Sequence, residues 1–188
     1  MNFIELFIFS LQPDISSKSL KELKKKLFYK CYEKDTNLIS EEKFYILKSG
    51  VIKSNIQTTD NKKYNTKLFI PDSKSTIISN ILNIPKSNNN TYKCLTKVEL
   101  YECTYKAFIG LVEEDFEISK FYNRLLEYQS ILNEKRIDDL VELNTKQRYL
   151  KLLEEIPYIE KLIPKYQIAN YLNISPVQLT RIRKGKIS

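Results

Sequence analysis

Residues 163–186, at the C-terminal end of the chain, contain two short helical patterns joined by an asparagine. Ile168 and Leu172 lie one helical turn apart, which gives the first helix a buried edge. Ala169 is small, so a second helix can cross closely over it. Asn173 stands where the turn needs a positive φ, which asparagine tolerates better than most residues. The pattern predicts two helices that meet at a sharp corner.

The second of these helices has its own start signal. Ser175 is a good N-cap, and Pro176 suits the first helical position. Leu179 and Ile182 then face back to the core. This order is that of a helix-turn-helix, whose second helix enters the major groove of duplex DNA. An ordinary helical hairpin is the alternative, because two short amphipathic helices at a corner are common.

The outer side of the second helix carries the candidate contacts to DNA. Arg181 is the best candidate for reading a base, because arginine pairs bidentately with O6 and N7 of guanine, although a plain phosphate contact is the alternative. Val177, Gln178 and Thr180 are secondary readers. The candidates for phosphate contact and positioning are Lys165, Arg183, Lys184 and Lys186. Ser175 and Pro176, at the start of the helix, complete the candidate DNA-binding residues.

Positive charge is concentrated in the same part of the chain. Residues 145–188 hold nine Lys and Arg against three Glu, or +6, whereas residues 1–144 hold 22 basic against 20 acidic residues, or +2. A charge excess on a recognition-helix pattern is typical of a nucleic-acid-binding surface. It favours the helix-turn-helix over the ordinary hairpin.

The composition excludes several kinds of active site. The chain has no histidine and only three glycines. A Ser-His or Cys-His nucleophile, a His-ligated metal and a glycine-rich phosphate loop are therefore impossible. The three cysteines, Cys31, Cys94 and Cys103, have no metal-ligand spacing. We expect no enzyme activity, no metal and no cofactor.

Neither a membrane span nor a signal peptide is expected. No apolar run approaches the roughly 20 residues that a span needs. Residues 3–9 are apolar, but they are interrupted by Glu5 and lack a basic segment before them, so they read as a packing helix. The cysteines are then reduced thiols, and the expected location is the cytoplasm.

The middle of the chain reads as a series of short strands. A capped amphipathic helix is expected at residues 16–27, and turns are expected at Ser49-Gly50 and at residues 59–61. A short helix is expected around Ser75–Leu82. The expected strands are Phe28–Tyr32, Asn37–Ile39, Lys43–Lys48, Val51–Gln57, Tyr64–Ile70, Thr91–Leu95 and Val98–Thr104. Many short strands with one small helix indicate a β-barrel or roll.

The period then changes to that of helices. Helices are expected over Tyr105–Val112, Asp115–Leu143 and Thr145–Glu155. The long one carries apolar residues at a 3-4-3-4 spacing, which fits a core helix on its own barrel and a two-stranded coiled coil equally well. These residues are Ile118, Phe121, Leu125, Tyr128 and Leu132.

Two segments carry a family resemblance. Residues 44–53, Phe-Tyr-Ile-Leu-Lys-Ser-Gly-Val-Ile-Lys, look like the (F/Y)-x-I-x-x-G-x-(V/I) hairpin of the cyclic-nucleotide-binding roll. Residues 147–157, running into the helix-turn-helix, are similar to the C-terminal domain of short Crp/Fnr regulators. With its order of elements, nearly the whole chain resembles this family of bacterial transcription regulators.

The resemblance implies an α+β fold of three parts. These are a β-roll sensor domain at 1–112, a dimerisation helix at 113–143 and a helix-turn-helix domain at 144–188. It also tips the long helix towards a homodimer, with the five apolar residues above as its seam. The implied partners are double-stranded DNA, read as a pseudo-palindrome, and RNA polymerase as a further candidate. Residues 157–164 are short for a β-wing, so contacts are expected mainly from helices.

One departure from the family concerns the ligand pocket. Members that bind cyclic nucleotide carry a Gly-Glu pair that opens a short helix, and an Arg before the next strand. Backbone N–H groups and a guanidinium neutralise the cyclic phosphate there. Here the matching residues, Asp72, Ser73, Lys74, Asn90 and Thr91, include no glycine and no arginine. We expect a degenerate pocket and no dependence on cyclic AMP.

An alternative hypothesis assigns the main function to the β-roll. In that reading the chain is a sensory module that binds another small molecule or a protein, and DNA binding is secondary or lost. Failure to bind DNA at low salt, together with a retained metabolite, would favour this rival.

Overall fold

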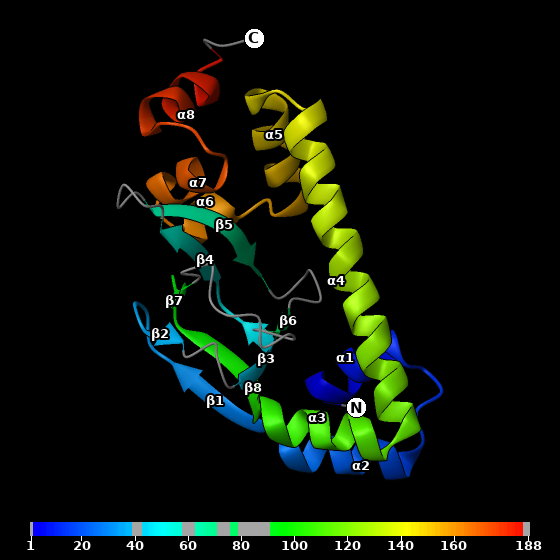
Figure 1. Cartoon of the computed structure of the whole chain (residues 1–188). Coiled ribbons are helices and arrows are strands. Elements are labelled where there is room, and N and C mark those ends of the chain that lie inside the picture. The colour runs from blue at the N-terminus through cyan, green and yellow to red at the C-terminus, as the bar shows by residue number, and fades with distance from the viewer. Residues whose placement is uncertain (1, 39–42, 58–62, 71–75, 79–90, 186–188) are drawn as a thin grey trace.

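The computed structural model describes residues 2–38, 43–57, 63–70, 76–78 and 91–185. Helices and strands form an α+β fold in which a two-sheet β-roll lies beside one long helix (Figure 1). The helices are α1 (Phe3–Leu11), α2 (Ser17–Lys26), α3 (Tyr105–Glu114), α4 (Phe116–Glu142), α5 (Thr145–Glu155), α6 (Ile159–Leu162), α7 (Lys165–Tyr171) and α8 (Pro176–Arg183). The strands are β1 (Phe28–Tyr32), β2 (Asn37–Leu38), β3 (Lys43–Ser49), β4 (Ile52–Gln57), β5 (Lys63–Phe69), β6 (Thr76–Ile78), β7 (Thr91–Cys94) and β8 (Val98–Thr104).

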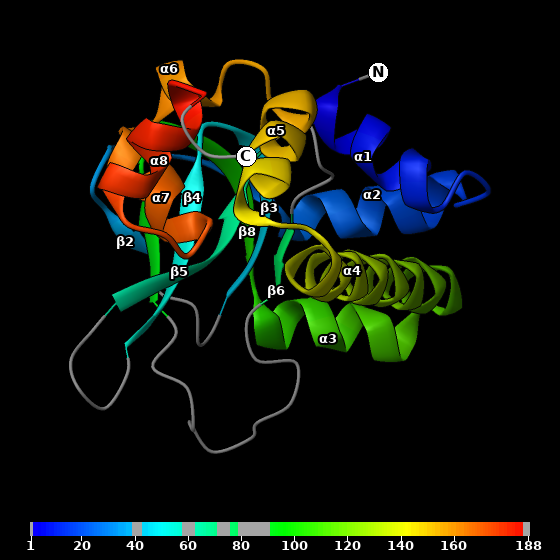
Figure 2. The same cartoon turned by 90° about the horizontal axis from the view of Figure 1, so that it is seen from above.

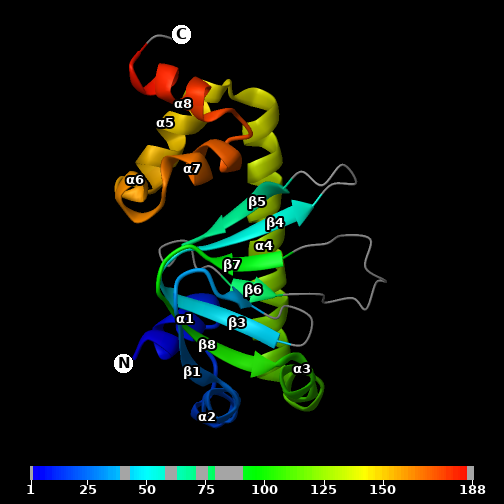
Figure 3. The ribbon, with the colours of Figure 1, turned by 90° about the vertical axis from the view of Figure 1, so that its left-hand side faces the viewer.

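The strands form two antiparallel sheets, in the orders β1-β8-β3-β6 and β2-β7-β4-β5 (Figure 3). The seven strands expected from the sequence are confirmed to within one residue at either end. The short helix expected around Ser75–Leu82 is wrong at its beginning, because Thr76–Ile78 is a strand that pairs with β3. Residues 75 and 79–82 lie outside the described part of the chain. A Thr-Ile-Ile run is β-branched throughout, and such residues fit a pleated strand better than a helix.

Strand β3 is buried on both of its faces. Phe44 and Ile46 point to a cluster formed with the helices, while Tyr45 and Leu47 point to the second sheet. Each of these four side chains is at most 2% exposed. The run is therefore continuously apolar, because a strand covered on both sides does not alternate with polar residues.

The Ser49-Gly50 turn joins the two sheets. It was expected as a hairpin, but β3 and β4 lie in different sheets, so the turn is a corner. Gly50 has φ +90°, and a Cβ there would lie 2.3 Å from the carbonyl oxygen of Lys97. Only glycine fits this corner. The residues 59–61 lie outside the described part, although β4 and β5 do pair as a hairpin.

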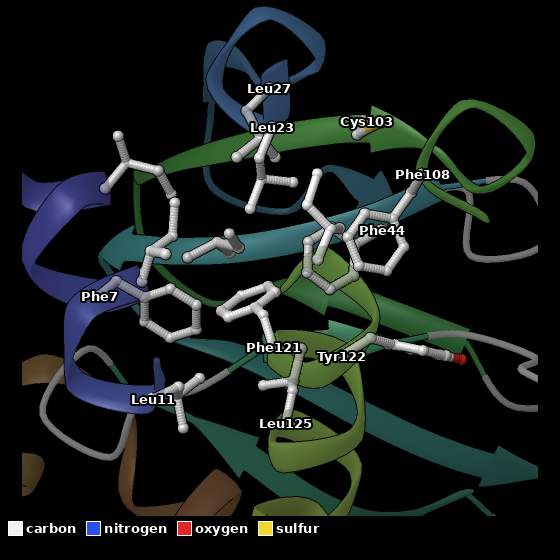
Figure 4. Close-up of a cluster of buried hydrophobic side chains, with 14 of the residues drawn as sticks. Phe7, Leu11, Leu23, Leu27, Phe44, Cys103, Phe108, Phe121, Tyr122 and Leu125 are labelled. Carbon is white, nitrogen blue, oxygen red and sulfur yellow. The ribbon is translucent and has the colours of Figure 1, made fainter. Parts of the chain in front are cut away.

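The helices α1 to α4 share one apolar cluster with the β1-β8-β3-β6 sheet (Figure 4). Phe44 stacks on Phe108 with ring centroids 4.4 Å apart, and Phe7 meets Phe121 edge to face at 6.3 Å. The start of α4 is fixed by Asp115, whose carboxylate accepts hydrogen bonds from the N–H groups of Glu117 and Ile118. This cluster anchors the first half of α4 to the roll.

The C-terminal helices are packed on the other end of the roll, above β4 and β5 (Figure 3). Val51, Ile70 and Leu95 from the roll lie in the same apolar cluster as the core residues of α5 to α8. Seen from above, α7 and α8 stand over β4 and β5, and α4 is viewed almost along its axis (Figure 2). The roll and the C-terminal helices are thus joined by this apolar cluster as well as by α4.

Candidate nucleic-acid interface

Helices α7 and α8 form the corner that the sequence predicts. Asn173 has φ +57°, and the N–H of Ile174 donates to the carbonyl oxygen of Ala169 at 3.0 Å. Ala169 and Leu172 are fully buried, Leu179 is 1% exposed and Ile182 is 6% exposed. Residues 157–164 contain the short helix α6 and no strand.

The N-terminus of α8 is capped from both sides. The N–H of Gln178 donates to Ser175 Oγ at 3.1 Å, and the N–H of Ser175 donates to Gln178 Oε1 at 2.9 Å. This capping box fixes the direction in which the chain enters α8. It also occupies the Gln178 side chain, which the sequence analysis assigned to reading bases. The Ser-x-x-Gln spacing is visible in the sequence, so this use of Gln178 could have been predicted.

Arg183 is engaged by a neighbouring helix of the same chain. Its Nε lies 2.6 Å from Glu160 Oε1 and its Nη2 lies 2.9 Å from Oε2, which makes a bidentate pair between α8 and α6. Tyr149 on α5 donates its hydroxyl to Glu160 Oε1 at 2.7 Å. Burial alone would raise the pKa of the Glu160 carboxyl, but the hydrogen bonds from Tyr149 and Arg183 outweigh it and hold that pKa below its usual value. In this arrangement Arg183 orients α8 rather than reaching outward to a phosphate.

The remaining candidates face solvent. Val177 is 61% exposed, and Lys165, Thr180, Arg181 and Lys184 are exposed as well. Thr180 donates its hydroxyl to the carbonyl oxygen of Pro176 at 2.9 Å. Within the described part of the chain, Arg181 has neither a hydrogen-bond partner nor an ion pair. Ser175 and Pro176 are exposed at the start of the helix, and Lys186 lies outside the described residues.

No protein-family model matches the sequence, and no curated protein matches it. Solved structures do match. FixK2 from Bradyrhizobium japonicum superposes with a TM-score of 0.68 at 13% identity, over 85% of this chain and 83% of that one. A Crp/Fnr regulator from Eubacterium rectale superposes with a TM-score of 0.66 at 16% identity, over 95% of this chain and 86% of that one. CLP of Xanthomonas campestris, a c-di-GMP-responsive regulator, superposes with a TM-score of 0.61 at 14% identity, over 90% of this chain and 91% of that one.

The chain has the Crp/Fnr fold. This confirms the resemblance drawn from residues 44–53 and 147–157. At such low identity the likeness concerns the fold alone, and the roles of individual residues rest on their own geometry.

The predicted dimer seam on α4 needs correction. Ile118, Phe121 and Leu125 are each fully buried, in the cluster that joins α4 to its own roll (Figure 4). Tyr128 packs partly against the same cluster, and Leu132 lines a cavity between the roll and the C-terminal helices. Three of the five residues are therefore unavailable to a partner, because the chain itself covers them.

A second apolar stripe runs along the outer side of α4. Ile137 is 59% exposed, Leu140 44% and Val141 80%. Positions i, i+3 and i+4 share one face of a helix. The exposed Ser130 continues this line towards the N-terminus of the helix, whereas Leu126, one turn further back, packs against the internal cluster. The sequence analysis missed this stripe, because Ser130 and Asn133 interrupt its apolar pattern.

The predicted ligand pocket of the roll falls largely outside the described residues. Asp72, Ser73, Lys74 and Asn90 lie outside the described residues, and Thr91 is the first residue of β7. Among the described residues, no group of His, Cys, Asp and Glu could hold a metal ion, and no helix is long and apolar enough to cross a membrane. Cys31, Cys94 and Cys103 are free thiols.

Proposed function

We propose that this protein is a cytoplasmic, DNA-binding transcription regulator that acts as a homodimer. The observation that carries the proposal is the outer face of α8. Arg181 is exposed there without a partner in the described part of the chain, on a helix whose N-terminus is capped and whose buried side is locked by Leu179 and Ile182. The +6 charge of residues 145–188 supports a polyanionic partner.

In the proposed complex, α8 of each protomer enters the major groove. Two such helices in a dimer reach successive grooves, roughly 34 Å apart, on a pseudo-palindromic site. Arg181 reads a guanine, with Val177 and Thr180 beside it, while Lys165 and Lys184 contact phosphates. Gln178 and Arg183 set the position of α8 through the capping box and the Glu160 pair.

The proposed dimer seam is the outer stripe of α4, defined by Ser130, Ile137, Leu140 and Val141. Ile137, Leu140 and Val141 are 59%, 44% and 80% exposed in the protomer, so they are available to a partner. Apolar residues exposed in a line on a long helix are the usual surface of a two-stranded coiled coil.

We further propose that the regulator works without cyclic AMP. Residues 70–76 contain no glycine and one aspartate, and residues 89–91 contain no cation. A cyclic phosphate would therefore meet a carboxylate where other members of the family supply donors. RNA polymerase remains a candidate partner of the DNA-bound dimer.

Arg181→Ala and Lys184→Ala test the proposed recognition face, since both remove one exposed positive charge from the same helix. Arg181→Ala should weaken binding to the selected site by about 1–3 kcal/mol and relax the preference at one base pair of each half-site. Lys184→Ala should weaken binding to all sequences alike and lower the log–log salt slope by about one.

The measurement is selection from a random duplex pool with each variant, followed by titration at several salt concentrations. Lys21→Ala, an exposed lysine on the distant helix α2, is the control for a simple change in net charge. An Arg181→Ala selection that returns the wild-type sequence preference would show that the recognition face is misplaced.

A further inference from the structure

A cavity of about 160 Å³ lies where the roll meets the C-terminal helices. Its described walls come from β5, α4, α5 and α7, which lie close to one another in the middle of Figure 1. Leu68, Leu132, Leu152 and Ile156 form apolar parts of the wall. Roughly 150 Å³ is enough for a benzene ring. The cavity thus suits a small organic molecule rather than a nucleotide.

Two cations in the wall have no carboxylate partner among the described residues. Lys67, on β5, donates to the side-chain oxygen of Asn133 on α4, which is a neutral group. Burial lowers the pKa of the Lys67 ammonium, since a charge is poorly solvated there. The second cation is Arg136 on α4.

Arg136 reaches across the boundary between the two parts of the protein. Its Nη2 donates to the carbonyl oxygen of Tyr171 at 2.7 Å, and its guanidinium lies 4.0 Å from the centre of the Tyr171 ring. These contacts fix the plane of the guanidinium but supply no negative charge. A guanidinium has five N–H donors, so these contacts leave donors for a further acceptor.

The acidic residues in the wall are already paired with other lysines. Glu155 lies 3.3 Å from Lys135 Nζ, and Asp139 forms an ion pair with Lys151. The wall therefore carries an excess of positive charge at Lys67 and Arg136, beside apolar side chains. A group that combined an apolar body with a negative charge would satisfy both.

We propose that this cavity binds a small organic anion, a carboxylate on an apolar body about the size of a benzene ring. Lys67 and Arg136 hold the carboxylate, and Leu132, Leu152 and Ile156 surround the body. None of the described lining residues belongs to the expected cyclic-nucleotide pocket, which the sequence assigns to residues 72–74 and 90–91. Because its walls belong to the roll, α4 and the C-terminal helices, an occupant stabilises the docked arrangement of these parts.

Calorimetric titration of the full-length protein with benzoate tests the site without requiring DNA binding. We expect saturable binding with a dissociation constant on the order of 1 mM, typical for a ligand of this size. Benzamide has the same shape without the charge, and it should bind at least about tenfold more weakly because it gains little from the two cations. This comparison needs no variant.

Two variants locate the binding. Lys67→Met keeps an unbranched side chain but removes the charge, and Leu132→Trp fills the cavity while leaving both cations in place. Each should weaken benzoate binding at least about tenfold. Lys30→Met, at an exposed position on β1 in the other sheet, is the matched control and should bind as the wild type does. Thermal melting of each variant verifies that it is folded.

Three results would overturn the proposal. One is the absence of saturable benzoate binding to the wild type. Another is equal affinity for benzoate and benzamide. The third is unchanged benzoate affinity in folded Lys67→Met and Leu132→Trp protein. None of these results depends on whether the protein recognises DNA, so this proposal and the proposed function can fail separately.

Discussion

The inner and outer faces of α4 carry similar apolar residues but meet different surroundings. On the inner face, Ile118, Phe121 and Leu125 are fully covered by the roll and the N-terminal helices. On the outer face, Ile137 and Val141 are more than half exposed. A regular apolar spacing shows that a helix face is covered, but it does not show whether the cover is the same chain or another one. In α4 the more regular stripe is used internally, and the interrupted stripe is exposed in the protomer.

The largest expected effect is that of Leu125→Asp on folding. The substitution removes a fully buried leucine and places an unpaired carboxylate in the cluster. We expect a loss of about 4 kcal/mol or more, which is a large part of the 5–15 kcal/mol that holds a typical domain together. Circular dichroism and urea unfolding should show a largely unfolded or strongly destabilised protein. A stable, folded monomer would instead return the inner stripe to the dimer interface.

Ile137→Glu should act on assembly rather than on folding. Ile137 is 59% exposed, so its replacement should change the stability of the protomer by about 0.5 kcal/mol at most. In the proposed seam the new carboxylate faces its own copy, and the dimer dissociation constant should rise on the order of a hundredfold.

Ile131→Glu provides the matched control for that variant. Ile131 is 60% exposed on the same helix, but six residues turn the side chain by about 240° from Ile137. Light scattering over a range of concentrations should give monomers for Ile137→Glu and dimers for Ile131→Glu. If both variants stay dimeric, the outer stripe is not the seam.

Helix α8 shows the same division between side chains engaged within the chain and side chains left exposed. Arg181 and Arg183 lie two residues apart, yet only Arg183 has an ion-pair partner in the described residues. Arg183→Met should destabilise the protein by about 1–3 kcal/mol, since a bidentate pair is lost and Glu160 is left without its cation. Arg181→Met should change stability by about 0.5 kcal/mol at most. Urea unfolding of both variants decides this, and equal stabilities would mean that the Arg183 pair contributes nothing.

Much of the fold was predictable because it depends on local patterns. The residue type alone predicts the local structure at Asn173 in the turn, at Ser175 at the N-cap and in the β-rich runs of the strands. The pair between Glu160 and Arg183 was not predictable, since it joins residues 23 positions apart through the packing of α6 on α8. The pairing of Thr76–Ile78 with β3 likewise depends on tertiary contacts. The sequence alone does not show which polar side chains are exposed and free, because that depends on which of them already form contacts within the fold.

The smallest expected effect is the pH dependence that Glu160 contributes. Its pKa in the folded protein lies below its usual value, because hydrogen bonds from Tyr149 and Arg183 outweigh the effect of burial. A carboxyl with a depressed folded pKa stabilises the protein fully above the unfolded pKa of about 4.3, and this stabilisation is lost as the pH falls through the folded pKa. Glu160→Gln should therefore be less stable than the wild type at neutral pH, and the difference should shrink as the pH falls towards 3. Urea unfolding at a series of pH values measures this, with Glu154→Gln, an exposed position on α5, as the control that should follow the wild type. If the stability difference between the wild type and Glu160→Gln stayed constant down to pH 3, the Glu160 carboxylate would not hold Arg183 through its charge. Arg183 and Arg181 would then differ only in how they pack.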